Sequence, residues 1–488
     1  MESIVKQKRI DEDRFLAMRK DVLAEWPTGK EVDLEEAVAY QRSLPDTKNF
    51  KKVTEKLKEE GRTAVWPRAG TPVLEEEIAL VKALVAAGVR HVPVTIDSYT
   101  RRYDFARAEQ ALEESKKTGK ALLNGYPIVT HGVRNTRKVI ESVDAAFSPR
   151  GAGKLAMEIA LASGMTAAGK SSFLEFGSYE KKRTLEDCFE HSQYTDRLAG
   201  YYTERGAVIT TDLHGFVPSG IFPLSVNIAC IVVDALVAAE QGVRSMMPQA
   251  HLCGNMAQDI AWMRVIPRLM REYLDRSGYT DVAIPGTLAN QIPLFPVPQG
   301  LGGAFAYLCY TAMVATLAEP QAVFVRTIDE GAGVPTTEAH NLSYEAANWI
   351  FNVIRTQKPR FEIEGIEEEE RVTEIEVKAI LEKILELGDG DVVIGSIRAV
   401  EAGVLDSPFS PNIHVRDEVL GVKDNQGACR YLDFGNLPLP EGIKDFHRAK
   451  IAERETAEGR KMDYQAVIDD FWAFSRGKLI GTGTKEAK

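Results

Sequence analysis

Charged side chains follow several short apolar runs of this chain, and most of them are arginines. The runs are typical of buried strands, and the residues at their ends are Arg68 in WPRAG, Arg101 in TIDSYTRRYD, Arg150 in FSPRGAG, and Arg326 with Glu330 in VRTIDEGAG. A guanidinium stays charged at physiological pH and binds a carboxylate or a phosphate through two parallel hydrogen bonds. Three such groups at one mouth would suit a di-acid or a phosphate. On spacing alone the alternative stays open that each arginine pairs locally, as Arg101 could with Asp97 or Asp104.

Metal-binding and phosphate-binding motifs are weak in this sequence. The eight histidines show no spacing that a metal site would require. The segment GAGK at 151–154 lacks the GxxxxGK[ST] spacing of a phosphate loop. We therefore predict no metal ligands in this chain.

The strand-end residues need a scaffold that brings those ends together. From about residue 60 to 345, short β-type runs alternate with amphipathic helical stretches such as LEEEIALVKALVAAG. The candidate strands lie near 63–70, 92–98, 121–127, 145–151, 207–212, 244–251, 281–287 and 322–330. This alternation predicts a parallel sheet. About eight units fit an α/β fold of the (β/α)8 TIM-barrel type, whose active sites lie at the C-terminal strand ends. A doubly wound open sheet is the alternative.

The chain divides into three parts by composition. We predict an N-terminal helical extension over 1–60, a catalytic barrel over 61–356 and a C-terminal α+β lobe over 357–488. The acidic run EIEGIEEEERV at 362–372 indicates a solvated helix face.

Composition narrows the class of protein. The 488 residues carry a net charge of −11, which disfavours a nucleic acid or an anionic membrane as partner. The N-terminus lacks the apolar core of a signal peptide, and we expect no apolar run of membrane-spanning length. Five scattered cysteines without a CxxC motif are typical of reduced thiols. These features predict a cytoplasmic protein that binds neither nucleic acid nor membrane.

Longer strings carry a family resemblance over nearly the whole chain. They include WPTGKEVDLEEAV at 26–38, PRAG at 67–70, TIDSYTR at 95–101, LLNGYP at 122–127, CGNMAQDIA at 253–261, GVPTTEA at 333–339 and CRYLDFGNLP at 429–438. In this set and order the chain resembles the large, or epsilon, subunit of glutamate mutase, also called methylaspartate mutase.

The resemblance implies an isomerase in which the barrel closes over adenosylcobalamin held by a separate small subunit, which supplies the axial histidine. In the family a 5′-deoxyadenosyl radical takes a hydrogen from the substrate and a glycyl fragment migrates. L-Glutamate and threo-3-methyl-L-aspartate are thereby interconverted, in an assembly with a homodimer of large subunits. Asp212 and His214 begin like the cobalamin-ligand motif DxHxxG, but Val217 replaces its glycine, so we take the match as chance.

The resemblance also assigns roles to residues of this chain. Substrate contacts fall on Arg68, Arg101, Arg150, Gly151, Glu175 and Tyr179, with the three arginines holding the two carboxylates. Cofactor contacts fall on Gly70, Asn124, Ser178, Phe295, Arg326, Glu330 and Val334, with Glu330 at the ribose hydroxyls.

The chain departs from the family pattern where the substrate's amino group is bound. The family's ammonium-binding glutamate falls at Gly169, and a substrate tyrosine falls at Glu175. Further departures are Gly151 for histidine, Ser178 for proline, His214 for phenylalanine and Arg326 for lysine. Either Glu175 takes over the ammonium contact, or the substrate is a different dicarboxylate and the chain a paralogous mutase. A non-catalytic barrel that binds a partner is the third alternative.

Overall fold

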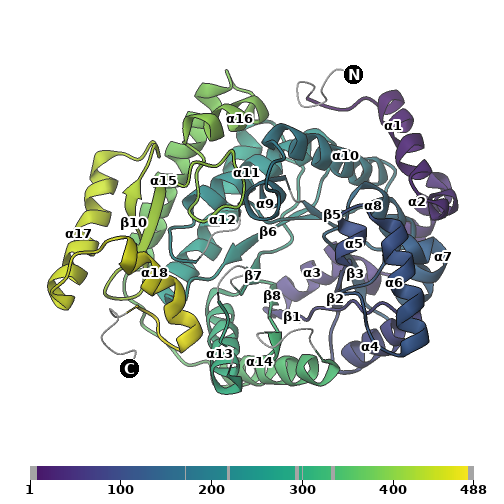
Figure 1. Cartoon of the computed structure of the whole chain (residues 1–488), viewed down its shortest axis with the longest axis horizontal. Helices are drawn as coiled ribbons and strands as arrows, with labels where there is room; N and C mark the ends of the chain where they lie inside the picture. The colour runs from purple at the N-terminus through teal and green to yellow at the C-terminus, as the bar shows by residue number, and fades with distance from the viewer. Residues whose placement is uncertain are drawn as a thin grey trace.

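The structure is a computed structural model that describes residues 8–170, 172–216, 220–291, 296–298, 300–330 and 336–481. Within these ranges, parallel strands form a ring at the centre of the molecule, and helices surround it (Figure 1). The strands are β1 (Ala64–Trp66), β2 (His91–Thr95), β3 (Ala146–Arg150), β4 (Ala167–Lys170), β5 (Thr210–Leu213), β6 (Met246–His251), β7 (Leu288–Asn290) and β8 (Ala322–Phe324).

The ring is made of two ladders joined by a few backbone hydrogen bonds. One ladder runs β1-β8-β7-β6-β5-β4 and the other β2-β3. Ala69, just beyond β1, bridges Val94 of β2. The Thr166 N–H donates to the carbonyl of Phe147 at 3.1 Å, which links β3 to the start of β4. The predicted (β/α)8 barrel is thereby confirmed over the open sheet.

Helices follow the strands around the outside of the barrel. They are α4 (Leu74–Ala86), α5 (Ser98–Arg101), α6 (Phe105–Thr118), α7 (Ile128–Glu141), α8 (Lys154–Ala162), α9 (Ser172–Leu174), α10 (Leu185–Glu204), α11 (Ser225–Glu240), α12 (Met256–Arg276), α13 (Leu301–Ala318) and α14 (Thr337–Gln357). Before the barrel come α1 (Glu12–Ala24), α2 (Leu34–Ser43) and α3 (Phe50–Glu59). After it come α15 (Ile366–Leu387), α16 (Val392–Ala402), β9 (Val419–Lys423), β10 (Cys429–Phe434), α17 (Glu441–Glu458) and α18 (Tyr464–Ala473). The three-part division of the chain stays a prediction.

Two of the expected strands are placed differently in the structure. The segment 281–287 makes a single bridge, from Ala283 to Ser245, and the seventh strand, β7, begins at Leu288. The segment 121–127 is not a strand; Tyr126 makes a single bridge to Ile96, and a side chain at Gly125 would meet the Thr95 carbonyl at 2.6 Å. The fourth strand is instead β4, whose sequence AAGK has none of the β-branched residues that mark strands. Its small residues suit a narrow barrel interior but give no strand-type pattern, so the strand was not predicted from the sequence.

Alternate residues of each strand point into the barrel. The innermost cluster joins Trp66, Ala146, Ala167, Met247, Leu288 and Ala322 to Phe50 of α3, which closes the N-terminal end of the barrel. The Phe50 ring lies 5.4 Å from Trp66 and 4.6 Å from His91. Two residues further along several strands, polar side chains replace this apolar layer.

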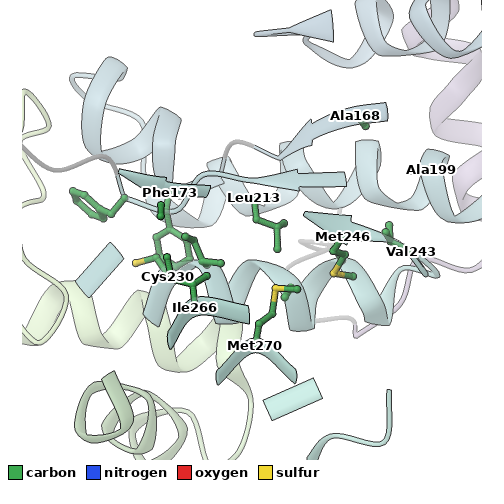
Figure 2. Packing of buried hydrophobic residues seen from close by; sticks show 14 of the residues in the cluster. Ala168, Phe173, Ala199, Leu213, Cys230, Val243, Met246, Ile266 and Met270 are labelled. Atoms are coloured by element: carbon green, nitrogen blue, oxygen red, sulfur yellow. The ribbon is translucent and has the colours of Figure 1, made fainter. Parts of the chain in front are cut away.

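The outward-facing residues of the same strands pack against the surrounding helices. Ala168 and Leu213 lie on this side of β4 and β5, with Cys230 of α11 and Ile266 and Met270 of α12 beneath them (Figure 2). All five side chains are buried. This packing fixes the positions of β4 and β5, and with them the inward-facing residues that alternate with these side chains.

Helix α13 corrects one expectation. Its 18 residues, LGGAFAYLCYTAMVATLA, are long and apolar enough by length and composition to cross a membrane. One third of the helix is buried, and it packs on α12 and α14 at the barrel's outer surface. A single helix of this kind is weak evidence for a membrane span, because helices of soluble cores pass the same test.

A buried charge network attaches the C-terminal lobe to the barrel. Arg430 of β10 pairs with Glu369 of α15 at 2.5 Å and with Asp424 at 2.8 Å, and all three side chains are enclosed. Gln258 of α12 donates to Glu369 at 2.9 Å and accepts from the Cys429 N–H at 2.7 Å. The acidic run at 362–372 is therefore not a purely solvated face, since Glu369 points inward to Arg430.

We expect Arg430→Ala to destabilise the chain by about 3–5 kcal/mol, because it leaves two buried carboxylates without their counter-charge. Tm and the urea midpoint measure the effect. Arg448→Ala is the matched control, since Arg448 pairs with Glu441 and Asp445 on the exposed face of α17, and its midpoint should stay near that of the wild type. Equal midpoints for both variants would contradict the anchoring role of Arg430.

Candidate active site

A cavity opens at the C-terminal ends of the strands. The cavity has a volume of about 180 Å³ and leads into a wider mouth of about 680 Å³. Of the residues predicted from the sequence, Arg68, Arg101, Arg150, Gly151, Glu175, Tyr179 and Arg326 line the cavity, and Asn124 lines the mouth. Arginines from separate strand ends therefore meet at one cavity, as the sequence predicted.

Two of these arginines share one acid. Arg68 follows β1 and its Nη1 lies 2.9 Å from Glu330 Oε1, while Arg326 Nη1 lies 3.6 Å from the same oxygen. The other carboxylate oxygen, Glu330 Oε2, is buried without a partner. The site therefore holds an acceptor that a hydroxyl donor could satisfy.

Arg101 ends the short helix α5, and the local acids do not hold it. Asp97 caps α5 by accepting from the Tyr99 and Thr100 N–H groups, and Asp104 caps α6. A side chain at Gly151 would lie 2.5 Å from Arg101 Cδ. The glycine at 151 therefore makes room for Arg101 over the cavity.

Arg150 ends β3 and stands on an aromatic floor. Its guanidinium carbon lies 5.5 Å from the Trp66 ring centre and 5.8 Å from that of Phe324. Its Nη1 forms a close ion pair with Asp212 of β5. Beneath it, burial and the charge of Arg150 lower the pKa of His91 well below its usual range, so that ring is neutral.

Polar residues from β5, β6 and β7 continue this floor. His214 Nε2 lies 3.1 Å from Arg150 Nη1 and 3.1 Å from Gln249 Nε2. Gln249 Nε2 also donates to Asp212 Oδ2 at 3.1 Å, and its Oε1 accepts from Asn290 Nδ2 at 2.9 Å. Both neighbours of His214 Nε2 are donors, so this nitrogen is the acceptor and the ring carries its proton on Nδ1.

The wall that carries Glu175 and Tyr179 is a single π-helical turn over Glu175–Tyr179. The lobe supports this turn from outside: Asn412 Nδ2 donates to the Phe176 carbonyl at 3.0 Å and Ser410 Oγ to the Gly177 carbonyl at 2.8 Å. Burial raises the pKa of the Glu175 carboxyl. The lobe thus positions two predicted substrate contacts.

Some of the predicted cofactor contacts lie among the described residues and others do not. Asn124 Oδ1 caps the Ser98 N–H at 2.9 Å, which leaves its amide N–H groups as donors. Gly70 has a φ of +129°, and a side chain there would meet the Thr95 carbonyl at 2.6 Å, so the position requires glycine. Ser178 Oγ is buried without a partner. Phe295 and Val334 lie outside the described residues.

Comparison with known proteins decides the family. A model of the methylaspartate mutase E chain family matches residues 44–483. The chain belongs to this family. A glutamate mutase epsilon subunit from Desulfitobacterium hafniense is 38% identical over 478 residues, covering 97% of this chain and 98% of the relative. One from Treponema denticola is 36% identical over 485 residues, covering 98% and 99%.

Membership of the methylaspartate mutase family makes the chain an isomerase chain. Among solved structures, a phospho-2-dehydro-3-deoxyheptonate aldolase from Thermotoga maritima matches with a TM-score of 0.36 at 9% identity, over 62% of this chain and 71% of that one. A likeness of that size adds nothing to the fold assignment, which rests on the strand pairing.

Sequence reasoning missed several cavity residues of this family member. Gln249, His251 and Asn290 line the cavity, and His214, set aside as part of a chance motif, does so too. The segment RSMMPQAH was recognised as a strand, but only charged residues at strand ends were sought. Extending the search to amide and imidazole side chains at alternate positions would have found Gln249 and His251.

Glu77 supports the loop that carries Arg68 and Gly70. It is fully buried on α4, and its Oε2 accepts from the Thr71 N–H at 2.8 Å and the Thr71 hydroxyl at 3.2 Å. Burial raises the pKa of Glu77 from 4.5 to about 7. In the unfolded chain this carboxyl ionises near its ordinary pKa, so folding holds a proton that unfolding releases.

The raised pKa of Glu77 predicts a pH dependence. Its contribution to stability is fully present below pH 4.5 and is lost as pH rises to about 7, a total of roughly 3 kcal/mol. Glu77→Gln keeps an acceptor for Thr71 and cannot ionise. The Tm of the variant minus that of the wild type should therefore increase as the pH rises from 5 to 8. Parallel Tm curves for the two proteins would contradict a titrating Glu77.

Proposed function

We propose that this chain is the catalytic barrel subunit of an adenosylcobalamin-dependent carbon-skeleton mutase that interconverts L-glutamate and threo-3-methyl-L-aspartate. The observation that carries the proposal is the meeting of Arg68, Arg101 and Arg150 at one cavity in a member of the methylaspartate mutase family. Two carboxylates of one substrate suit three guanidinium groups, because each group donates in a fixed planar fork.

The chain's own residues orient the substrate and exclude water. Arg150, backed by Trp66 and Phe324, would take one carboxylate at the floor, and Arg101 would take the other from the mouth. Arg68 is tied to Glu330 and would complete the clamp. Fixed positions for both ends of the substrate leave the middle carbons to react, which is how a protein directs a radical rearrangement.

The residues present fit adenosylcobalamin. Glu330 Oε2 is a buried acceptor without a partner, which suits the ribose hydroxyls, and Gly70 allows close approach of a ligand to the backbone. Asn124, Ser178 and Arg326 would contact the cofactor around the mouth. When bound, this cofactor supplies a carbon-centred radical that removes a hydrogen atom from the substrate. The axial histidine would come from a separate small subunit.

The assembly is proposed on the same basis. The relatives' names as epsilon subunits support a partner subunit, and we propose a small cobalamin-binding subunit that covers the mouth. We further propose a homodimer of the large chains and a cytoplasmic location.

Reconstitution tests the function. The chain is mixed with a family small subunit and adenosylcobalamin, and L-glutamate is added under electron paramagnetic resonance. We expect a cob(II)alamin signal that needs the chain, the small subunit and the amino acid together. Turnover without cobalamin, or a complete mixture without a signal for glutamate or any other dicarboxylate, would refute the proposal.

Arg101→Lys tests the clamp. A lysine offers a point charge in place of a two-pronged fork, so substrate affinity should fall by about 1.5–3 kcal/mol. Arg107→Lys is the control: Arg107 lies on the adjacent helix α6 with 65% of its side chain exposed. Substrate titrations of the reconstituted complex measure both. An Arg101→Lys variant with wild-type affinity would remove Arg101 from the clamp.

A further inference from the structure

Three buried polar atoms without a protein partner lie together at one wall of the cavity. They are Asp212 Oδ1, Arg150 Nε and Arg150 Nη2. The Arg150 side chain is 14% exposed and that of Asp212 is 4% exposed. Native proteins rarely leave buried donors and acceptors unpaired, and a cluster of them beside a cavity is accounted for when a ligand pairs with them.

Gly169, which lines the cavity, is the neighbour of Asp212 on the adjacent strand. The two residues are register partners across β4 and β5, so their inward sides face the same space. Gly169 lines the cavity, and a Cβ built on it would lie 3.2 Å from Asp212 Oδ1. Because glycine has no Cβ, the approach to Asp212 Oδ1 past Gly169 is open, and a ligand nitrogen in the cavity could come within hydrogen-bonding distance of the carboxylate.

His214 does not satisfy the open oxygen. Its Nε2 is 3.7 Å from Asp212 Oδ1, which is too long for a hydrogen bond. The same nitrogen faces two donors, Arg150 Nη1 and Gln249 Nε2, so it carries no proton to give. Asp212 Oδ2 is already engaged by Arg150 and Gln249. Oδ1 is therefore the acceptor that this network presents to a ligand.

The wall presents opposite charges side by side. Arg150 has two donor nitrogens for a carboxylate, and Asp212 has one acceptor oxygen for a cation. An α-amino acid carries a carboxylate and an ammonium on the same carbon, which matches this pair.

We propose that Asp212, reached over Gly169, binds the ammonium group of an α-amino dicarboxylate whose neighbouring carboxylate lies on Arg150. The inference rests on the proposed function, because the arginine clamp supplies the second carboxylate contact. It makes Asp212 and Gly169 the residues that distinguish glutamate from a dicarboxylate without an amino group.

The charge state of Asp212 agrees with this role. Burial opposes its ionisation, but the Arg150 guanidinium lowers the pKa of Asp212 to about 2. Burial raises the pKa of Glu175, the other acid of the cavity. Of these two carboxyl groups, Asp212 is the one whose ionised form the site stabilises.

Calorimetric titration tests the inference with L-glutamate and glutarate, which share two carboxylates and differ in the amino group. The chain is titrated in complex with a family small subunit and hydroxocobalamin, which lacks the adenosyl group and so permits binding without turnover. The wild type should prefer glutamate by about 10- to 100-fold, the range of a charged hydrogen bond.

Asp212→Asn should abolish that preference. Glutamate affinity falls by about the same 10- to 100-fold, while glutarate affinity stays or rises, because Arg150 is no longer neutralised by Asp212. Gly169→Ala is a second variant that leaves the Arg150–Asp212 pair intact and places a methyl group 3.2 Å from Asp212 Oδ1, across the approach of the nitrogen; it should lower glutamate affinity far more than glutarate affinity. Gly302→Ala is its control, since nothing lies within 4 Å of a Cβ there.

Glu175→Gln separates the two acids. If Asp212 binds the ammonium, this variant keeps the wild-type preference for glutamate. A preference that survives Asp212→Asn, or disappears in Glu175→Gln, overturns the inference alone and leaves the proposed function to the cob(II)alamin signal. A wild-type complex that binds neither ligand overturns the inference and also removes the arginine clamp on which the proposed function depends.

Discussion

The narrow interior of a ring of parallel strands governs the rest of this molecule. Inward-facing positions recur at every second residue of each strand, so the interior is filled in successive layers. Trp66 fills much of the lowest layer, and alanines at 146, 167 and 322 accommodate it. Because side chains fill that layer, the side chains at the next inward positions lie above it, near the C-terminal ends of the strands. Arg150 stands on Trp66 for this reason, and the cavity begins at that height.

The second constraint is the burial of charge at the same height. The side chains of Arg150, Asp212 and His214 are largely buried, and an unmatched buried charge is costly. The network therefore alternates donors and acceptors through Gln249 and Asn290. The donor and acceptor atoms that the network leaves without a partner, on Arg150 and Asp212, lie at the cavity wall. The groups that the site can bind follow from these atoms.

The sequence predicted the barrel and the convergence of its arginines. Parallel strands place their C-terminal ends at one edge, and arginines that follow strand-type runs can be recognised in the sequence. It did not reveal β4, whose alanines and glycine satisfy the interior and carry no β-type signature. Nor did it show that Gly169 faces Asp212, since register between strands is set by three-dimensional packing. The inward position of Glu369 was hidden for a similar reason: its neighbours Glu367 and Glu368 are chemically identical, and only the helix's orientation against Arg430 selects one of them.

The support that Asn412 and Ser410 give to the π-helical turn has an evolutionary consequence. The cavity wall that carries Glu175 and Tyr179 is completed by hydrogen bonds from a segment more than two hundred residues later in the chain. The barrel and the lobe are therefore not interchangeable modules. A lineage that exchanged or shortened its C-terminal part would also alter the shape of this cavity wall, so selection on the shape of the cavity acts on both parts together.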